Sequence, residues 1–287
     1  MKRPVNDTDW NEIWGKKIKQ WHQGAGKACR EFWEDETSAE VYAEKQARRN
    51  QERVDEMLPL LNLKPEFKVL DIGAGPGSLA LPMAPQVAGV TTVEPAHGMN
   101  QVMAREIARQ GMENIRCVQK AWEEVDVTRD LDGPYEVVLA SMSLGMEDLR
   151  GAVEKMEQVC CGRVILFWHA GIPGWEEMPR ALWPTLFNTQ YHGGPKSDLL
   201  FQVLYQMGIY PQVQVTHHRF SEIFPTMDMA VKFYSRRFPL LQEEHLPTVE
   251  AYIRENCRKH DNKWIMDFDH ATMGFSWTVE TKQRRAA

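Results

Sequence analysis

The chain has 287 residues, enough for one large α/β domain with additions or for two small domains. Hydrophobic residues make up 43% of it, so a sizeable core is expected, and the net charge of −6 excludes a global positive field that would attract nucleic acid. The N-terminal region lacks the apolar core of a signal peptide, and no run of about eighteen uncharged apolar residues occurs. We therefore expect a cytoplasmic protein without a membrane segment.

The five cysteines are odd in number and scattered, which argues against a disulfide framework. The pair Cys160-Cys161 has no second Cys/His pair at ligand spacing, so we interpret it as two small buried residues. His217 and His218 point to opposite faces of a predicted strand and are interpreted as structural. No metal site is predicted.

Residues 1–50 are charged and rich in aromatic side chains, and they are expected to form an N-terminal helical extension or lid. Trp10 and Trp14 lie four residues apart and so share one helical face. A further helix is predicted from about Ala39 to Leu61, and Leu63-Lys64-Pro65 stops it before the first strand.

A glycine-rich turn follows the first predicted strand, Lys68–Ile72. It reads Gly73-Ala74-Gly75-Pro76-Gly77-Ser78, and the next strand ends at Glu94. Glycines let a backbone approach a ligand closely, and an acid at the tip of the next strand can hold a ribose diol. The third glycine comes one residue too early for a dinucleotide fingerprint, and Asp71 would repel a pyrophosphate but suits an ammonium group. The pattern favours a cationic amino-acid nucleoside over NAD.

After Glu94, predicted helices and strands alternate as in βαβ units with a parallel, buried sheet. The expected elements are helix 98–111, strand 115–118, strand 135–140, helix 147–159, strand 163–168, helix 198–208, strand 212–219 and helices 227–237 and 247–259. Residues 172–197, rich in Pro, Gly and aromatics, are expected as an insertion. Trp264–Asp269 and Phe275–Glu280 are expected to form a late antiparallel hairpin.

The segment around Asp71, Gly73, Gly75 and Gly77 resembles the first motif of class I S-adenosylmethionine-dependent methyltransferases, Asp/Glu-x-Gly-x-Gly-x-Gly after an apolar strand. The resemblance has motif-level specificity over residues 55–170. It implies an α/β fold with a Rossmann-like doubly wound, mostly parallel sheet and a late antiparallel strand, joined by N-terminal helices and an inserted aromatic lid. The expected divisions are the extension 1–50, the cofactor-binding core 51–171, the insertion 172–197 over the active site, and the remainder of the core with its hairpin, 198–287.

The resemblance also implies roles for single residues. Asp71 and the amides of Gly73, Gly75 and Gly77 would face the methionine portion of the cofactor, and Glu94 would hold its ribose hydroxyls. Met99 matches a position that the family often places against adenine, with ordinary core packing as the alternative. Ala121 and Trp122 match the third motif, which here lacks its usual acid. Trp122 either walls the adenine or packs the sheet edge.

The ends of the fourth and fifth predicted strands carry candidates for the reaction itself. Ser141 is a candidate cofactor-binding residue after the fourth strand, where the family addresses the methyl group and its acceptor, and capping of the next helix is the alternative. His169 ends the fifth strand at the edge where open α/β sheets bind ligands, and it is the candidate base, with a structural histidine as the alternative. Candidate acceptor-binding residues, suited to a flat or cationic substrate, are Ser143, Trp168, Trp175, Tyr191 and His192.

The implied activity is that of an enzyme: in-line transfer of a methyl group from S-adenosylmethionine, releasing S-adenosylhomocysteine. The predicted acceptor is a small molecule, because residues 140–145 lack the Asn/Asp-Pro-Pro-Tyr/Phe motif of enzymes that methylate exocyclic amines of bases. Two alternatives stay open: a methyltransferase acting on RNA or protein, and a cofactor-binding module without turnover. The acceptor atom and the oligomeric state, a homodimer included, are also left open.

Overall fold

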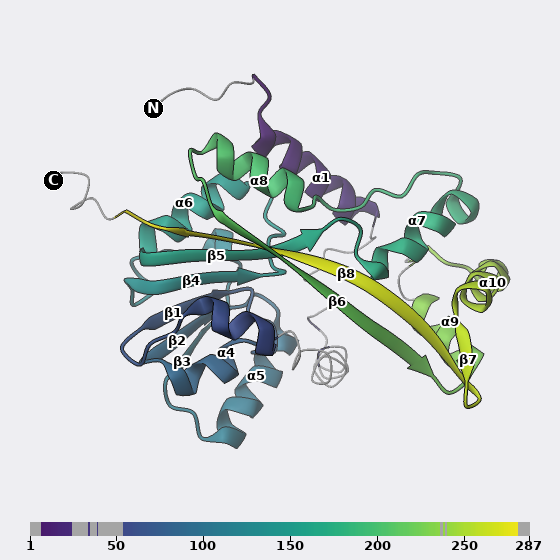
Figure 1. Cartoon of the computed structure of the whole chain (residues 1–287), viewed down its shortest axis with the longest axis horizontal. Helices are drawn as coiled ribbons and strands as arrows, with labels where there is room; N and C mark the ends of the chain where they lie inside the picture. Colours follow the sequence, from purple (N-terminus) through teal and green to yellow (C-terminus); the bar gives the residue numbers. More distant parts are fainter. Residues whose placement is uncertain are drawn as a thin grey trace.

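The apolar runs of the sequence pair into one sheet in the computed structural model, which describes residues 7–24, 34, 39, 54–235, 238 and 240–280. The strand order is β3-β2-β1-β4-β5-β8-β6, with β7 paired to β8 (Figure 1). The strands are β1 (Lys68–Ile72), β2 (Gly89–Val93), β3 (Ile115–Val118), β4 (Tyr135–Ser141), β5 (Cys160–Ala170), β6 (Gln212–Phe224), β7 (Arg258–His260) and β8 (Lys263–Thr278).

Strands β1 to β5 are parallel to one another, and β8 and β6 continue the sheet in antiparallel fashion. The parallel strands read as continuous apolar runs because helices cover both faces. This confirms the doubly wound, mostly parallel sheet with a late antiparallel strand. The order also places the ends of β1 and β4 side by side. The sequence of strands across the sheet reverses its direction between these two, and ligands commonly bind at such a point.

The predicted hairpin of 264–269 with 275–280 is wrong. Both stretches belong to the single strand β8, which pairs with β5 on one side and β6 on the other. Gly274 does not mark a turn: a Cβ there would lie 2.9 Å from Cε1 of Phe167, so the small residue makes room for an aromatic ring on the neighbouring strand. The actual turn lies before β8, where Asp261 and Asn262 adopt positive φ values of 47° and 59°.

Two sets of helical segments sandwich the sheet. One face packs against α1, α6 and α8, and the other against residues 54–61 and α4 (Figure 1). The helices are α1 (Trp10–Gly24), α4 (Ala80–Met83), α5 (His97–Gln110), α6 (Leu149–Val159), α7 (Gly174–Phe187), α8 (Ser197–Gln206), α9 (Met227–Ser235) and α10 (Leu246–Asn256). Short 3₁₀ turns are η1 (Leu58–Leu61), η2 (Ala84–Gln86), η3 (Trp122–Glu124) and η4 (Glu243–His245).

The predicted helices and strands agree with these bounds to within a few residues, and β5 and β6 are longer than expected. Helix α1 supports a helical N-terminal segment, and Trp14 on it is fully buried. Most of the predicted helix from Ala39 to Leu61 lies outside the described residues. Its end appears as a helical turn over residues 54–57 followed by η1.

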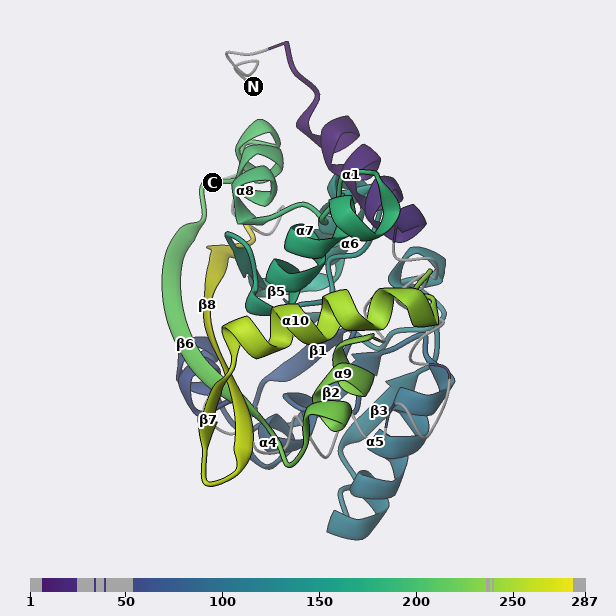
Figure 2. The same cartoon turned by 90° about the vertical axis from the view of Figure 1, so that its right-hand side faces the viewer.

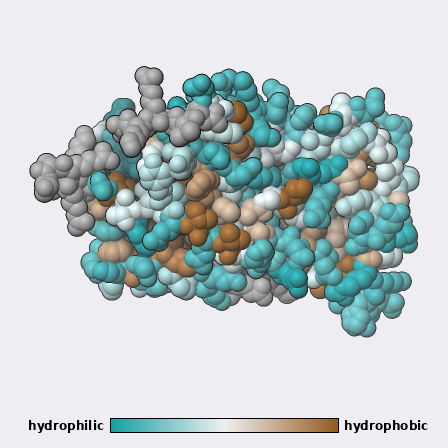
Figure 3. Space-filling model, turned by 45° about the horizontal axis from the view of Figure 1, so that its top comes forward, coloured by the Kyte–Doolittle hydropathy of each residue, from teal (hydrophilic) through white to brown (hydrophobic). Residues whose placement is uncertain are grey.

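A smaller apolar cluster extends the molecule beyond the parallel strands. Helices α7, α9 and α10 gather around the far ends of β6 and β8 (Figure 2), and their side chains surround Phe224, Met266 and Phe268. The expected insertion thus contains a helix, α7, that packs on the antiparallel part of the sheet. Among the described residues, no helix combines the length and the hydropathy that a membrane crossing requires. On the face seen in Figure 3, hydrophilic residues surround small groups of apolar ones.

Candidate functional site

The glycine turn lies at the end of β1 and is fixed by backbone hydrogen bonds. The amide of Gly73 donates to the carbonyl of Val93 at 2.7 Å, which carries the pairing of β1 with β2 one residue further. Gly73, Gly75 and Gly77 have φ values of +70°, +58° and +87°, a region that residues with a Cβ rarely adopt. A Cβ on Gly73 would overlap the side chain of Ser143, whereas a Cβ on Gly75 would meet nothing within 4 Å. The turn therefore packs on one side and is open on the other.

Glu94 lies directly beside this turn. Its carboxylate accepts hydrogen bonds from the amide of Gly75 at 2.9 Å and from the amide of Ala96 at 2.9 Å, and the residue is only 8% exposed. These two amides fix the carboxylate of Glu94 at the side of the turn. Asp71, at the end of β1, is 2% exposed. The structure thus brings together the acid, the glycines and the second acid that the sequence singled out.

The loop after β4 braces the turn from the other side. Ser143 donates its hydroxyl to the carbonyl of Ile72 at 2.5 Å, so this side chain has a structural partner in the strand that enters the turn. Met142 adopts a positive φ of 57°, and its amide donates to the carbonyl of Phe167 at 3.0 Å. Strained backbone of this kind often occurs at ligand sites. Ser141 ends β4 opposite Phe167 in register.

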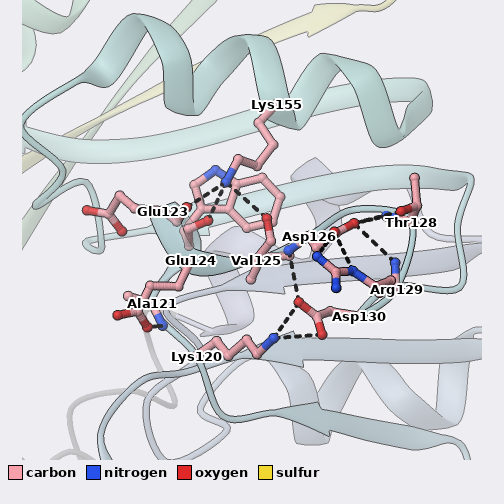
Figure 4. A network of polar contacts seen from close by, with 11 residues as sticks. Lys120, Ala121, Glu123, Glu124, Val125, Asp126, Thr128, Arg129, Asp130 and Lys155 are labelled. Carbon is pink, nitrogen blue, oxygen red and sulfur yellow. Dashed lines mark hydrogen bonds and ion pairs between the residues drawn. The ribbon is translucent and has the colours of Figure 1, made fainter.

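The segment after β3 is tied down by a polar network (Figure 4). Lys155 of α6 donates to the carbonyls of Trp122, Glu123 and Val125 at 2.8, 3.0 and 3.2 Å. The amide of Ala121 donates to a carboxylate oxygen of Glu124 at 3.2 Å. These contacts hold the third-motif segment rigidly against α6.

The same network continues to residue 130. Lys120 donates to both carboxylate oxygens of Asp130 at 2.8 and 2.7 Å. The hydroxyl and amide of Thr128, together with the guanidinium of Arg129, hold the pKa of the Asp126 carboxyl well below its usual range. Asp126 is therefore ionised at neutral pH and serves the loop rather than proton transfer.

Two of the residues matched to adenine lie deep in the protein. Trp122 is 2% exposed, and its indole donates to the carbonyl of Ala152 at 3.1 Å. Met99 is 3% exposed and packs with Ala96 and Val102. This geometry favours the packing alternative for both side chains, and contact with an adenine stays a prediction.

His169 lies at the end of β5, beyond the glycine turn. Its Nδ1 is 3.4 Å from Nε2 of His270 on β8, and its ring centroid is 6.0 Å from that of Trp175 at the start of α7. Trp175 in turn stacks with Trp21 of α1 at 6.4 Å. An imidazole and two indoles from three separate elements therefore gather at one place.

Of the other predicted acceptor residues, Trp168 adjoins this position, with its ring centroid 5.1 Å from that of His169, whereas Tyr191 packs elsewhere. Trp168 is 3% exposed, donates its indole N–H to the carbonyl of Pro195 at 2.8 Å and packs against Trp14 in the core. Tyr191 packs on Trp183 at 5.4 Å in the cluster of α7, α9 and α10, and His192 is exposed. The expected aromatic lid thus divides between two clusters.

Sequence reasoning missed Trp21 and His270 as members of the site. Trp21 had a usable signal, because it follows Trp14 by seven residues and so lies on the same helical face. His270 had none, since its place beside His169 depends on the pairing of β8 with β5.

The strand order, the glycine turn and the acid at the tip of β2 define an α/β domain built to bind a nucleoside cofactor at the carboxyl edge of its strands. Comparison with known proteins adds a sequence match. Residues 42–160 match the family profile described as a methyltransferase domain. This part of the chain is therefore similar to methyltransferases, a family that uses S-adenosylmethionine as its cofactor.

Three relatives illustrate the similarity. An uncharacterised protein of Haemophilus influenzae is 29% identical over 51% of this chain and 57% of its own length. The uncharacterised methyltransferase YcgJ of Bacillus subtilis is 27% identical over 46% of this chain and 52% of its own. The 23S rRNA (uracil(1939)-C(5))-methyltransferase RlmD of Klebsiella pneumoniae is 38% identical over 28% of this chain and 18% of its own. The match to each of these curated relatives thus spans less than two thirds of the relative's length.

A solved structure supports the fold. The crystal structure of YcgJ from B. subtilis covers 80% of this chain and 99% of its own, with 19% identity and a TM-score of 0.55. The sheet described above is thus shared with a known protein at low sequence identity.

The residues present fit the cofactor of the family. The open side of the turn at Gly75 offers space that a Cβ would occupy, and the carboxylate of Glu94 lies next to it. The buried carboxylate of Asp71 suits a cationic group.

Proposed function

We propose that this protein is an enzyme that transfers a methyl group from S-adenosylmethionine to a small-molecule acceptor. The observation that carries the proposal is the arrangement of Glu94 beside the open glycine turn, with its carboxylate bonded to the amide of Gly75 at 2.9 Å. The family profile matched by residues 42–160 supports the same reaction class.

The cofactor supplies an activated methyl group, so the chain has mainly to bind, orient and exclude water. Glu94 would accept the two ribose hydroxyls in charge-assisted hydrogen bonds. Asp71 would face the ammonium group, and the backbone of the glycine turn would lie along the amino-acid portion. The contacts of Ser143 and Met142 keep this turn in one conformation.

The acceptor side is supported by the position of His169. Asp71 pairs with Leu139, and Leu139 with Ile165, so the three lie at one level across the sheet. His169 follows Ile165 by four residues and therefore lies about 13 Å farther along the strands. His169 would then lie past the cofactor-binding turn, on the side from which an acceptor would approach. The rings of Trp175 and Trp21 beside it suit a flat or cationic molecule.

Helix α7 would cover this side of the site. Its Glu176 is fully buried, and Lys196 donates to it at 2.5 Å, which ties the following loop back onto the helix. A Cβ on Gly194 in that loop would lie 2.8 Å from the ring of Trp21, so the loop also packs closely on α1. Coverage of this side by α7 and the following loop would favour a small acceptor over a macromolecule.

Cofactor binding is the first test. Isothermal titration with S-adenosylmethionine should show affinity reduced at least tenfold in Glu94→Gln, on the order of 1.5–3 kcal/mol for a hydrogen bond to a charged group. Glu113→Gln, an exposed acid before β3, is the matched control and should bind as the wild type does. Thermal melting checks that both variants fold. Equal affinity in the wild type and Glu94→Gln, or tighter binding of NAD than of S-adenosylmethionine, would overturn the assignment.

The acceptor is tested by transfer of isotope-labelled methyl groups to separated fractions of small metabolites, total RNA and protein. Label in the metabolite fraction is expected. The Klebsiella relative is named for methylation of 23S rRNA, so label in RNA, with binding that weakens steeply as salt rises, would replace the small-molecule proposal. Tight cofactor binding with label in no fraction would support a binding module without turnover.

A further inference from the structure

Strand β6 forms the edge of the sheet opposite β3 and lies along one side of the molecule (Figure 2). Among the strands that the structure describes, β6 pairs with β8 alone, over every residue from Gln212 to Phe224 and without a break in register. The outer side of an edge strand presents a row of backbone N–H and C=O groups to which a further strand can bond. Natural proteins usually protect such an edge with charges, proline, bulges or a short strand.

The first part of β6 lacks these protections. The edge segment, Gln212–Thr216, contains no charged residue, no proline and no glycine. The stretch 199–218 around it has no Asp, Glu, Lys or Arg, although 26% of the chain is charged. The opposite edge is the four-residue strand β3, which carries the exposed Arg116. Of these two edges, β6 is therefore the one suited to pairing with another strand.

An exposed apolar patch adjoins the edge segment. Four of its side chains are between 44% and 72% exposed, namely Tyr205, Tyr210, Val213 and Val215. The two tyrosine rings meet edge-on with centroids 5.3 Å apart. Both valines lie on the face of the sheet that α8 covers, because Val213 pairs with Phe275 of the core cluster beneath that helix. Exposed tyrosine and apolar side chains with no charge among them are typical of the centre of a protein interface.

The edge segment reads nearly the same in both directions. Its order, Gln-Val-Gln-Val-Thr, places a valine on either side of Gln214 and a polar residue at each end. When two identical antiparallel strands are related by a two-fold axis, residue i of one faces residue j of the other, and j faces i. With the axis at Gln214, Val213 of each copy would face Val215 of the other, and Gln214 would face its own counterpart. The pattern therefore fits a second copy of this chain.

We propose that two copies of this chain associate through their β6 edges, paired antiparallel about Gln214. The pairing gives backbone hydrogen bonds to both edge segments and brings the valines of the two copies together beside the tyrosines. On the other face, the two Gln214 amides each offer donors and an acceptor to the other. Because residues 199–218 are uncharged, the net charge of −6 on each copy is not concentrated where the copies meet.

The expected dimer dissociates on dilution. Interfaces of standard size use about 20–30 residues from each partner, and the edge segment with its two tyrosines offers fewer. The interface is self-complementary, so each copy takes one partner and association should stop at two copies.

Sedimentation velocity of the full chain over a wide range of concentration tests the association. A species of twice the 33.2 kDa of one chain should appear as the concentration rises. Gln214→Lys places two like charges directly opposite each other across the axis, and Val215→Lys places a charge against the facing valine. Each variant should raise the dissociation constant by about tenfold or more.

A mixture of variants tests the register. Gln214→Glu alone should dimerise as poorly as Gln214→Lys, whereas the two variants mixed should form a dimer again, because opposite charges then face each other. Ile223→Lys is the matched control: Ile223 is an exposed apolar residue on the same strand and face, outside the edge segment, and its change should leave the dissociation constant unaltered. Urea unfolding checks that all variants fold.

Three results would overturn the inference: a wild type that stays at 33.2 kDa at every concentration, a dimer that persists in folded Gln214→Lys and Val215→Lys, or growth into species larger than a dimer. Strands β8, β5 and β4 separate β6 from the glycine turn, so Gln214→Lys should bind S-adenosylmethionine as the wild type does. Failure of the dimer therefore leaves the proposed function intact, and failure of cofactor binding leaves the sedimentation result standing.

Discussion

Alanine at Gly73 and at Gly75 should have different effects, although the two glycines belong to one turn. An ideal Cβ on Gly73 would lie 2.2 Å from Cβ and 2.8 Å from Oγ of Ser143, whereas a Cβ on Gly75 would meet no atom within 4 Å. Both residues have positive φ, so each alanine carries about 1–2 kcal/mol of backbone strain. Only Gly73→Ala adds an overlap in a packed region, which costs about 1–3 kcal/mol more.

The overlap can be isolated with Ser143→Gly. That change removes both atoms that the new Cβ would meet, and it also removes the hydrogen bond from Ser143 to the carbonyl of Ile72, worth about 1 kcal/mol. The double variant Gly73→Ala/Ser143→Gly should therefore lose less stability than the sum of the single variants. The expected interaction energy is about 1–3 kcal/mol.

Urea unfolding of the wild type and the four variants gives these free energies, and titration with S-adenosylmethionine gives the affinity for the cofactor. Gly73→Ala should unfold at clearly lower urea concentration than Gly75→Ala. Gly75→Ala should keep most of its stability and bind the cofactor at least tenfold more weakly, because its Cβ occupies the open side of the turn. Equal loss of stability in the two alanine variants, or strict additivity with Ser143→Gly, would refute this account of the turn.

Two other predictions concern buried groups. Burial raises the pKa of the Cys160 thiol to about 12, so this thiol stays protonated at neutral pH. Cys160 should therefore resist iodoacetamide in the native protein, while the exposed Cys117 is alkylated. Mass spectrometry of the labelled peptides measures the difference, and equal labelling of the two cysteines would contradict the burial of Cys160. Lys196→Met removes the hydrogen-bonded cation 2.5 Å from the fully buried Glu176 and leaves it with half-exposed Arg180 at 3.7 Å. The free energy of unfolding should fall by about 1.5–3 kcal/mol, and adding Glu176→Gln should recover part of that loss. A chemical-denaturation measurement with no loss in Lys196→Met would show that the pair is not stabilising.

The sequence by itself determined the parallel half of the sheet and the turn at its centre. Strands such as Lys68–Ile72 and Tyr135–Ser141 are short apolar runs bounded by turn residues, and helices such as α5 and α6 show their own periodicity, so local pattern is enough to place them. The glycines and Glu94 were predictable as a group, because the carboxyl ends of neighbouring parallel strands meet at one edge.

Contacts between residues far apart in the sequence could be found only from the tertiary structure. A glycine such as Gly274 is typical of a turn, yet in the structure it makes room for the ring of Phe167 on the neighbouring strand. The predicted hairpin is therefore one continuous strand, β8. The folded chain also shows that the hydroxyl of Ser143 bonds the carbonyl of Ile72 and that the indole of Trp122 bonds the carbonyl of Ala152, while the predicted ligand contacts of both residues stay predictions.

The surroundings of His169 show the same division. His169 could be selected from its place at a strand end, but His270 and His218 join it only through the antiparallel register of β5, β8 and β6. Periodicity specifies which face of an element is apolar, and it carries no information about which other element will cover that face. Register and packing between distant segments are set by the burial of the whole core, so only the folded chain decides them.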